Sequence, residues 1–463
     1  MKVAIIGAGA AGCFAAANLS EMSPETEITV FEARHRALAK LSITGGGHCN
    51  LTNTFEEDIP LPKIYPRGSR LMSRLLHVFD SEDTCGWFES HSVKIEVHEE
   101  GRVFPKSMDA GEVVRSLLSE MSRGGVRLRC GCRVLAITPR RGGIEVTWTC
   151  GTNEHNANAN RYENNRIIRN SSDIQECNEC SKSNVSQECN ECSKSNVTQE
   201  RNARKRGEYK QVETDIFDKV LVTTGGNTGY DFLSQTNIIM KKPCPSLFSF
   251  RLDDDIRSLS GTSVASVSVR LSGTAFKAFG PLLITDWGMS GPAILRLSSY
   301  AAEYLSETGY KATMLIGWLG PDVTERDALE RISSMIAENP KRILSNLVPD
   351  GISGALWNYL VRRSGGDPWR KASEVGTKTC RRLASLLVGD SYSIVGRNRF
   401  RDEFVTCGGV DLCSISSSTL EAKTFPGLYF AGEVLDIDAI TGGYNLQAAW
   451  TTGYVAAKAI TSS

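Results

Sequence analysis

Residues 2–12 read KVAIIGAGAAG, and this stretch decides the fold of the chain. The apolar run at 2–6 predicts a short buried strand, and the alanine-rich segment 12–20 predicts a helix. A glycine-rich turn separates the two, and EITVFEA at 27–33 predicts a second buried strand. This order predicts a βαβ unit, which is how a doubly wound α/β domain opens.

The turn after the first strand carries the glycine spacing of a dinucleotide site. Gly7, Gly9 and Gly12 form GxGxxG around Ala11. Such a turn is tight, lets the backbone approach a pyrophosphate, and directs the helix N-terminus at the phosphate charge. Glu32 ends the second strand, where a carboxylate accepts hydrogen bonds from ribose hydroxyls. These residues predict a bound dinucleotide. The pattern is common to NAD and FAD sites, so it does not distinguish between the two cofactors.

The C-terminal segment favours FAD. After the apolar strand LYF come Gly432 and Glu433, and a second glycine turn opens a final helix. NAD domains are ordinarily contiguous, whereas here both chain ends contribute. The positive end of the last helix suits the flavin pyrimidine edge, where negative charge gathers on reduction. The candidate groups at that helix start are Gly443, Tyr444, Asn445 and Leu446.

Length and composition limit the other possibilities. A chain of 463 residues is longer than a single core, so two or three packed units are expected. The 53 basic and 53 acidic residues cancel, which argues against nucleic acid as a partner. No stretch reaches the roughly 18 to 20 apolar residues of a membrane span. We expect a soluble, cytoplasmic protein with reduced cysteines. The two cysteines of CGC at 130–132 are predicted to be small buried residues on a strand.

Composition also divides the chain. Residues 1–243 read as the N-terminal part of the cofactor domain, and short alternating segments at 244–322 predict a β-rich substrate domain. The period lengthens towards 3.6 at 323–398, which predicts a small helical subdomain. Residues 399–463 return to the cofactor domain.

The segment 150–211 is an insert of different character. It is rich in Asn, Ser, Glu and Lys, and the unit QECNECSKSNV occurs twice, so we expect disorder. Its flanks, GGIEVTWT and TDIFDKVLVTTGG, predict a hairpin whose turn carries the insert. The repeats hold two CxxC pairs, but their gap is short for a zinc ribbon and duplication copies cysteines automatically, so no metal is predicted. Those cysteines are Cys177, Cys180, Cys189 and Cys192.

Several stretches resemble the BaiN/YhiN-type flavoproteins, also described as aminoacetone-oxidase-like or NAD(P)/FAD-dependent oxidoreductases. They are LAKLSITGGGHCNLTN, GRVFP, MSGPAILRLS, VTCGGV and GLYFAGEVLDIDAITGGYNLQAAWTTG. The resemblance covers nearly the whole chain outside the insert. It implies a Rossmann-type FAD domain interrupted by a β-barrel-like domain and a small helical one. It further implies a flavin-lining set, Lys40, Thr44, Gly45, Gly46, Cys49 and Asn50, and a set near the pyrophosphate, Thr224, Gly225 and Gly226.

The chain departs from that family at two positions, with His48 where Arg is usual and Asp286 where His is usual. The neutral-range pKa of histidine makes His48 a candidate proton donor to a reduced substrate, against the alternative of a hydrogen-bonded structural histidine. Asp286, before a Gly and Ser turn, is expected to be a capping or turn residue. No other catalytic residue is predicted.

These features predict an FAD-dependent oxidoreductase that transfers hydride between flavin and a small organic substrate. The chain has one GxGxxG, so NAD(P)H would serve as a transient electron donor. By family analogy the substrate is an enone or a steroid-like ring. Three alternatives remain open: a flavin amine oxidase that uses oxygen, a flavin-dependent RNA-modifying protein and a non-catalytic flavin-binding protein. A disulfide that reacts with the flavin is not expected, because CxxC occurs only in the insert.

Overall fold

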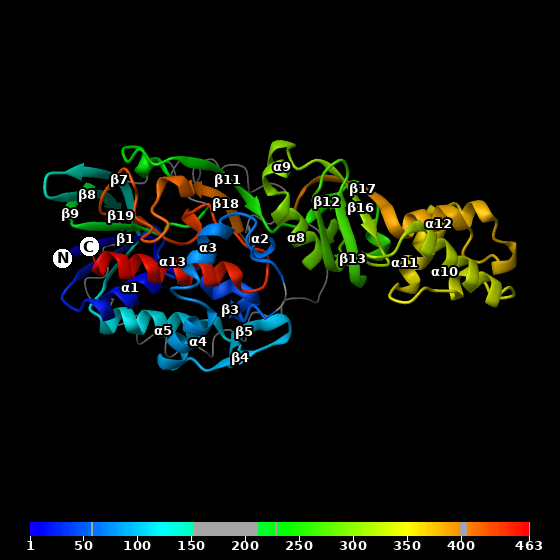
Figure 1. Ribbon diagram of the computed structural model, residues 1–463, viewed down its shortest axis with the longest axis horizontal. Coiled ribbons are helices and arrows are strands. Elements are labelled where there is room, and N and C mark those ends of the chain that lie inside the picture. Colours follow the sequence, from blue (N-terminus) through cyan, green and yellow to red (C-terminus); the bar gives the residue numbers. More distant parts are fainter. Residues whose placement is uncertain (57–58, 152–211, 227–228, 399–404, 463) are drawn as a thin grey trace, which may run out of the picture.

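The computed structural model describes residues 1–56, 59–151, 212–226, 229–398 and 405–462. Figure 1 shows an elongated molecule in which three units follow one another along the long axis. The unit that holds both chain ends lies at one end, a β-barrel occupies the middle, and a helical unit forms the other end. The predicted disorder and cysteine repeats of the insert lie outside the described residues.

The first unit is built on a five-stranded parallel sheet in the order β19-β10-β1-β2-β6. β1 is apolar along its whole buried length, as expected for a strand covered on both faces. Early and late segments pair in this sheet, so the fold is the predicted Rossmann-type domain made from both chain ends. The strands are β1 (Lys2–Ile6), β2 (Glu27–Glu32), β6 (Arg127–Cys130), β10 (Lys219–Val222) and β19 (Leu428–Phe430).

The first and last long helices lie side by side on this sheet (Figure 1). Small residues permit the contact, because a Cβ built on Gly453 would lie 2.8 Å from the carbonyl oxygen of Ala11. Further helices and a small antiparallel sheet, β3-β5-β4, complete the unit. The elements are α1 (Ala10–Met22), α2 (Leu61–Ile64), α3 (Ser69–Leu75), α4 (Ser81–Ser90), α5 (Ala110–Arg123), α13 (Tyr444–Thr461), β3 (Thr52–Asn53), β4 (Ile95–Val97) and β5 (Arg102–Pro105).

A second antiparallel sheet, β7-β8-β9, carries the insert. Its strands are β7 (Cys132–Arg140), β8 (Gly143–Cys150) and β9 (Val212–Phe217). Thr149 at the end of β8 pairs with Val212 at the start of β9. The prediction that the insert joins the two strands of a hairpin is therefore confirmed.

Cys132 and Cys150 form a disulfide, so the expectation of reduced cysteines is wrong for this pair. The cause is strand register: β7 and β8 are antiparallel, and the two cysteines lie directly opposite each other. The CGC motif also does not lie on one strand. Gly131, with a φ of +73°, turns the chain between β6 and β7, and Cys130 is exposed.

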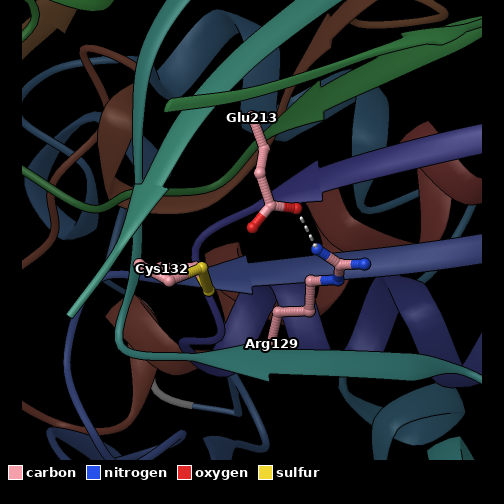
Figure 2. The surroundings of a disulfide bond; sticks show 4 residues. Arg129, Cys132 and Glu213 are labelled. Carbon is pink, nitrogen blue, oxygen red and sulfur yellow. Dashed lines mark hydrogen bonds and ion pairs between the residues drawn. A yellow bond between two sulfur atoms is a disulfide. The ribbon is translucent and has the colours of Figure 1, made fainter. Parts of the chain in front are cut away.

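Figure 2 shows the surroundings of this disulfide. Arg129 of β6 donates to the carboxylate of Glu213 on β9, with an N–O distance of 3.2 Å. The guanidinium also lies over the ring of Trp148, 5.4 Å from the centroid. The disulfide joins β8 to β7, and Arg129 of β6 contacts both β8 and β9. Both strands that flank the insert are therefore fixed to a neighbouring strand.

The middle unit is a closed barrel with the strand order β12-β15-β14-β13-β16-β17, which agrees with the predicted β-barrel-like domain. Asp286 is exposed in the turn between β14 and β15, the position expected for a turn residue. The helices α8 and α9 lie between β15 and β16 in sequence. The elements are β12 (Phe250–Leu252), β13 (Ser263–Leu271), β14 (Lys277–Ile284), β15 (Gly288–Ser290), β16 (Ala312–Gly317), β17 (Asp390–Arg397), α8 (Pro292–Tyr300) and α9 (Ala302–Glu307).

The helical unit is inserted between the last two barrel strands. It contains α10 (Glu325–Glu338), α11 (Gly354–Arg363) and α12 (Thr377–Gly389). β17 follows α12 and pairs with β12 and β16, so it belongs to the barrel although its residues fall within 323–398. The change of period that predicted the helical subdomain did not separate this strand from the preceding helix.

Two strands, β11 (Met240–Ser246) and β18 (Val405–Val410), connect the first unit with the barrel. They pair antiparallel and lie beside each other between the two units (Figure 1). Within the described residues, no helix has the combined length and hydropathy needed to cross a membrane.

Candidate functional site

Four parallel strands end side by side, and predicted site residues follow each strand. Ile6 of β1 lies between Phe31 of β2 and Val222 of β10, and Val222 lies beside Phe430 of β19. Ligands of doubly wound sheets bind at this carboxyl edge. The segments that meet here are 7–12, 224–226 and 432–433.

The three glycines of the first turn differ in the atoms that a side chain at each position would meet. Gly7 has a φ of +111°, and a Cβ there would lie 2.5 Å from the carbonyl oxygen of Thr223. A Cβ on Gly12 would lie 2.0 Å from the Gly7 oxygen, so both positions require glycine. Gly9 differs, since its Cβ would have no protein atom within 4 Å. It precedes α1, and no side chain caps that helix, so open space faces a free helix N-terminus.

Glu32 lies at the end of β2, and its carboxylate is fixed beside the glycine turn. One oxygen accepts from the Ala8 N–H at 2.9 Å and the other from the Arg34 N–H at 2.8 Å. Each carboxylate oxygen retains a further lone pair, which is the capacity that a ribose diol would use.

The turn after β10 contains an unpaired polar atom. The Thr224 hydroxyl is buried and has no hydrogen-bond partner among the described residues. Gly225 beside it has a φ of +79°, and a Cβ on Gly226 would lie 2.5 Å from the Thr406 Cβ. A buried hydroxyl without a partner costs free energy, so a ligand acceptor fits this position.

Glu433 joins three distant segments. One carboxylate oxygen accepts from Lys40 Nζ at 2.8 Å and the other from the Thr406 N–H at 2.8 Å. Gly432 has a φ of +76°, and a Cβ there would lie 2.7 Å from the Ala11 Cβ. The close approach of α1 therefore requires glycine at position 432. Thr406 was not predicted as a site residue, because its role depends on β18 lying beside the sheet edge.

The glycine loop η1 (Leu41–Gly47) is not a regular helix. Thr44 is extended, with ψ at 145°, and its hydroxyl donates to the Leu41 oxygen at 2.7 Å. Gly45 and Gly46 are left-handed, with φ of +59° and +70°. The loop therefore turns back on itself and presents main-chain groups rather than large side chains.

Asn50 connects this loop with α13. The surrounding groups assign the amide orientation, since the oxygen must face the only N–H among them. In that orientation the nitrogen donates to the carbonyl oxygens of Thr52 at 2.9 Å and Val103 at 3.2 Å, and the oxygen accepts from the Gly443 N–H at 3.1 Å. Close packing accompanies these bonds, because a Cβ on Gly443 would lie 2.3 Å from the Thr52 oxygen. Asn50 thus positions the start of the last helix.

No side chain caps the N-terminus of α13, which follows the left-handed Gly443, with a φ of +94°. Tyr444 is buried, and its carbonyl oxygen accepts from the Tyr65 hydroxyl at 2.9 Å. The end of this 18-residue helix carries a partial positive charge that no acidic side chain in its first turn neutralises.

The side chain of Asn445 does not face outward from this helix end. Its amide accepts from the Ala439 N–H and donates to the Ala439 oxygen, both at 2.9 Å. Leu446 is half-buried and packs against the core. At both positions, the backbone N–H rather than the side chain is therefore the group that could bind a ligand.

Cys49 and His48 follow the glycine loop and differ in exposure. Cys49 is fully buried, and burial raises the pKa of its thiol to about 12 although the Thr44 hydroxyl opposes the rise, so the thiol stays neutral. His48 is exposed, and its Nδ1 lies 2.8 Å from the Met108 carbonyl oxygen. A carbonyl only accepts, so Nδ1 carries hydrogen and Nε2 is the ring atom that remains for a substrate.

A buried ion pair that was not predicted from the sequence lies in the first unit, where this unit contacts α8 of the barrel. Arg67 makes two hydrogen bonds to Asp438, which is fully buried, and donates to the Ser299 oxygen at 2.8 Å. The Ser246 hydroxyl also donates to Asp438, at 2.8 Å. Burial lowers the pKa of Arg67, but Asp438 outweighs this effect and raises it above the ordinary value. The sequence feature that could have predicted this buried pair is the position of Asp438 within the apolar run VLDIDAI.

The arrangement fits a dinucleotide with a flavin. The unpaired Thr224 hydroxyl, the space in front of Gly9 and the uncapped start of α1 lie at one edge of the sheet, and the uncapped start of α13 lies beside Asn50 and Thr52. In the described part of the chain, no cluster of three or more His, Cys, Asp or Glu side chains is arranged to hold a metal ion.

Known proteins resemble this chain along nearly its whole length. The model of the HI0933-like protein Rossmann domain family matches residues 1–162 and 167–459. Two relatives are named ribosomal RNA dihydrouridine synthase: that of Escherichia coli K12 is 25% identical over 98% of this chain and 96% of its own, and that of Haemophilus influenzae is 24% identical over 98% and 97%.

Two further proteins extend the comparison. The 3-dehydro-bile acid delta(4,6)-reductase of Clostridium scindens is 24% identical over 99% of this chain and 98% of its own. The solved 3-ketosteroid delta1-dehydrogenase of Sterolibacterium denitrificans covers 99% of both chains at 10% identity, with a TM-score of 0.46. Because the family model spans nearly the whole sequence, the chain belongs to the HI0933-like Rossmann family, the FAD-dependent oxidoreductases of BaiN/YhiN type that its motifs resemble.

Proposed function

We propose that this protein reduces a carbon–carbon double bond conjugated to a carbonyl group, with FAD as cofactor and NAD(P)H as transient donor. The names of three relatives support this reaction, since dihydrouridine formation and delta(4,6) reduction of a 3-dehydro-bile acid both saturate a double bond in a conjugated ring. Bound FAD would supply hydride transfer at its ring, and the protein would bind, orient and tune it.

The observation that carries the proposal is the uncapped start of α13, held against the glycine loop by Asn50. Backbone N–H groups of 444–446 would stabilise negative charge at the flavin pyrimidine edge. The segments 7–12 and 224–226 would bind the pyrophosphate, and Glu32 would bind the ribose. Lys40 and Glu433 would lie beside the chain that links pyrophosphate and flavin.

Saturation of a conjugated double bond also needs a proton on the carbon next to the carbonyl. His48 in its imidazolium form is our candidate donor: Nδ1 keeps its hydrogen bond to Met108, Nε2 carries the proton that is transferred, and the ring is exposed at the end of the glycine loop. A His48→Asn variant keeps an amide to bond Met108 and removes the imidazole ring. Loss of product formation without loss of flavin reduction by NAD(P)H would support the assignment, whereas equal rates would assign the proton to water.

The preferred acceptor is a small enone, and an RNA base is the second candidate. A surface on the helical unit favours the second. Residues 323–389 contain eleven lysines and arginines against seven acidic residues in a chain of zero net charge. Backbone bonds join 341–344 to 370–372, including a bridge between Ile343 and Lys371. We call the exposed residues gathered there the tip patch: Lys341, Arg342, Trp369, Arg370 and Lys371.

The tip patch has the composition of a nucleic-acid contact. Trp369 is 65% exposed, which suits stacking on an unpaired base. None of its four cations takes part in an ion pair among the described residues, so their charge is available to phosphates. The patch lies on the unit farthest from the chain ends (Figure 1), so it would contact only a large substrate.

An anaerobic stopped-flow experiment tests the reaction. The FAD-loaded protein is mixed with NADH or NADPH, and the flavin absorbance is followed; reoxidation by a steroid dienone or by a ribosomal RNA transcript is then compared. We expect bleaching by a nicotinamide and reoxidation by one acceptor class. Peroxide formation from an amine without nicotinamide would instead establish an amine oxidase. Bound FAD that no donor reduces would leave a flavin-binding protein without this activity.

A further inference from the structure

A cysteine pair lies where the chain crosses between the first unit and the barrel. β11 carries the chain into the barrel and β18 carries it back, and they pair with each other at this junction (Figure 1). Cys244 of β11 lies directly opposite Cys407 of β18. This pair was not predicted from the sequence, because strand register rather than a CxxC spacing brings the two thiols together.

The two sulfur atoms are 3.0 Å apart, and both side chains are buried, with exposed fractions of 6% and 1%. Directly opposed residues of an antiparallel pair have Cα separations of about 4.5 to 5.5 Å, within the range that a disulfide spans. Both cysteines are free thiols here. Closing the remaining gap between the sulfurs therefore needs only a small side-chain movement.

The surroundings make the two thiols unequal. A hydrogen bond with Cys407 lowers the pKa of Cys244, burial opposes this effect, and nearby Arg67 reinforces it. Glu303 and Asp438 also face the pair and raise the pKa. The same sulfur–sulfur contact, together with burial, raises the pKa of Cys407 well above the ordinary value. Cys244 is thus the nucleophile of the pair and Cys407 the resolving thiol.

We propose that Cys244 and Cys407 form a reversible disulfide when hydrogen peroxide reaches the junction. The Cys244 thiolate attacks one peroxide oxygen, the O–O bond breaks, and the departing hydroxide leaves as water after taking a proton. The sulfur of Cys407 then attacks the sulfenic acid sulfur, the S–O bond breaks, and a second water leaves with the Cys407 proton. Two thiols lose two electrons, and one peroxide is reduced to two waters.

Such a disulfide would join the only two chain crossings that the described residues show between the first unit and the barrel. It would also restrain β18, whose residues contact the segment beside the candidate cofactor site. Thr406 donates to Glu433, and the Gly408 N–H donates to Asp436 at 3.1 Å, so both neighbours of Cys407 are tied to the segment that precedes α13. Oxidation would therefore clamp the barrel relative to the cofactor domain, whichever acceptor the enzyme uses.

The test is peptide mapping by mass spectrometry of the intact protein, reduced and then exposed to graded hydrogen peroxide. After an acid quench, free thiols are alkylated in denaturant. We expect a linked peptide containing Cys244 and Cys407, reversible by dithiothreitol and absent from Cys244→Ser and Cys407→Ser variants. Cys380 is an internal control, because it is also buried but is not paired with another cysteine of the described residues. It should remain alkylatable at peroxide concentrations that link the pair.

A second measurement tests whether the disulfide forms when the oxidant reaches the buried thiols only slowly. The protein is equilibrated in glutathione redox buffers until its thiol count is constant, and the same peptides are mapped. Both thiols remaining alkylatable in peroxide and in the most oxidising buffer would overturn the proposal. Oxidation of Cys244 and Cys407 on separate, unlinked peptides, to the same extent as Cys380, would overturn it as well.

Discussion

The amide oxygen of Asn50 accepts a hydrogen bond from the Gly443 N–H at 3.1 Å, and this bond joins the N-terminal glycine loop to the last helix. The same amide donates to two carbonyl oxygens, so one side chain satisfies three backbone groups. The candidate flavin-facing helix end is thus positioned by a residue from the opposite end of the chain.

Replacing Asn50 should separate positioning from folding. Asn50→Leu leaves three backbone groups without their partner, each worth roughly 1 kcal/mol or more when buried, so we expect a loss of about 3 kcal/mol and much weaker FAD binding. Asn50→Asp keeps the acceptor for Gly443 and loses both donors, so its loss should be intermediate. Denaturant midpoints and FAD titration measure both. Unchanged FAD affinity in Asn50→Leu would remove α13 from the cofactor site.

The glycine turn allows a matched comparison. A Cβ on Gly9 enters open space at an ordinary φ of −86°, so Gly9→Ala should fold like the wild type. If a pyrophosphate occupies that space, the methyl group should weaken FAD binding at least about tenfold, or roughly 1.4 kcal/mol. Gly12→Ala should instead lower the melting temperature of the apoprotein, because its Cβ collides with backbone. Full FAD affinity in Gly9→Ala would place the phosphates elsewhere.

The sequence predicted what depends on local pattern. GxGxxG after an apolar strand, with Glu32 at the end of the next, located the sheet edge, and the hairpin around the insert was visible in its flanks. Contacts made by the tertiary arrangement were not visible: the hydrogen bond from Thr406 to Glu433, the ion pair of Arg67 with Asp438, and both cysteine pairs, which strand register brings together. In each case the partners are distant in sequence or separated by a hairpin, and no local composition encodes their pairing.

The disulfide between Cys132 and Cys150 should contribute to stability without affecting the cofactor. The bond spans 18 residues, a loop for which the chain-entropy model gives about 3 kcal/mol. The double variant Cys132→Ser/Cys150→Ser should therefore unfold at lower denaturant and bind FAD normally. Wild type treated with dithiothreitol should move towards the variant. A midpoint equal to that of untreated wild type would mean that the bond contributes nothing measurable.

The tip patch yields a prediction that depends on the acceptor. Trp369→Ala should weaken RNA binding about tenfold, since base stacking is worth about 1 to 3 kcal/mol. Arg370→Ser/Lys371→Ser should reduce the salt dependence of RNA binding by nearly two phosphate contacts. Reduction of the flavin by NAD(P)H should be unchanged in both variants, because the patch is remote from the sheet edge. Unaltered RNA affinity at every salt concentration would remove the observation that favours an RNA substrate.

The Cys244 thiol should react with peroxide at lower pH than an ordinary thiol. Only the thiolate reacts, so the rate rises with pH and levels off above the pKa, and the hydrogen bond from Cys407 lowers that pKa below the usual 9.0. Without a resolving thiol, the sulfenic acid persists and can be trapped with a dimedone-type reagent. Cys407→Ser retains a donor, whereas Cys407→Ala removes it and leaves burial, Glu303 and Asp438 to raise the pKa. The half-maximal pH should therefore be higher in Cys407→Ala than in Cys407→Ser. Coincident profiles would show that Cys407 does not activate Cys244, and a midpoint above 9 in Cys407→Ser would show that burial outweighs Arg67.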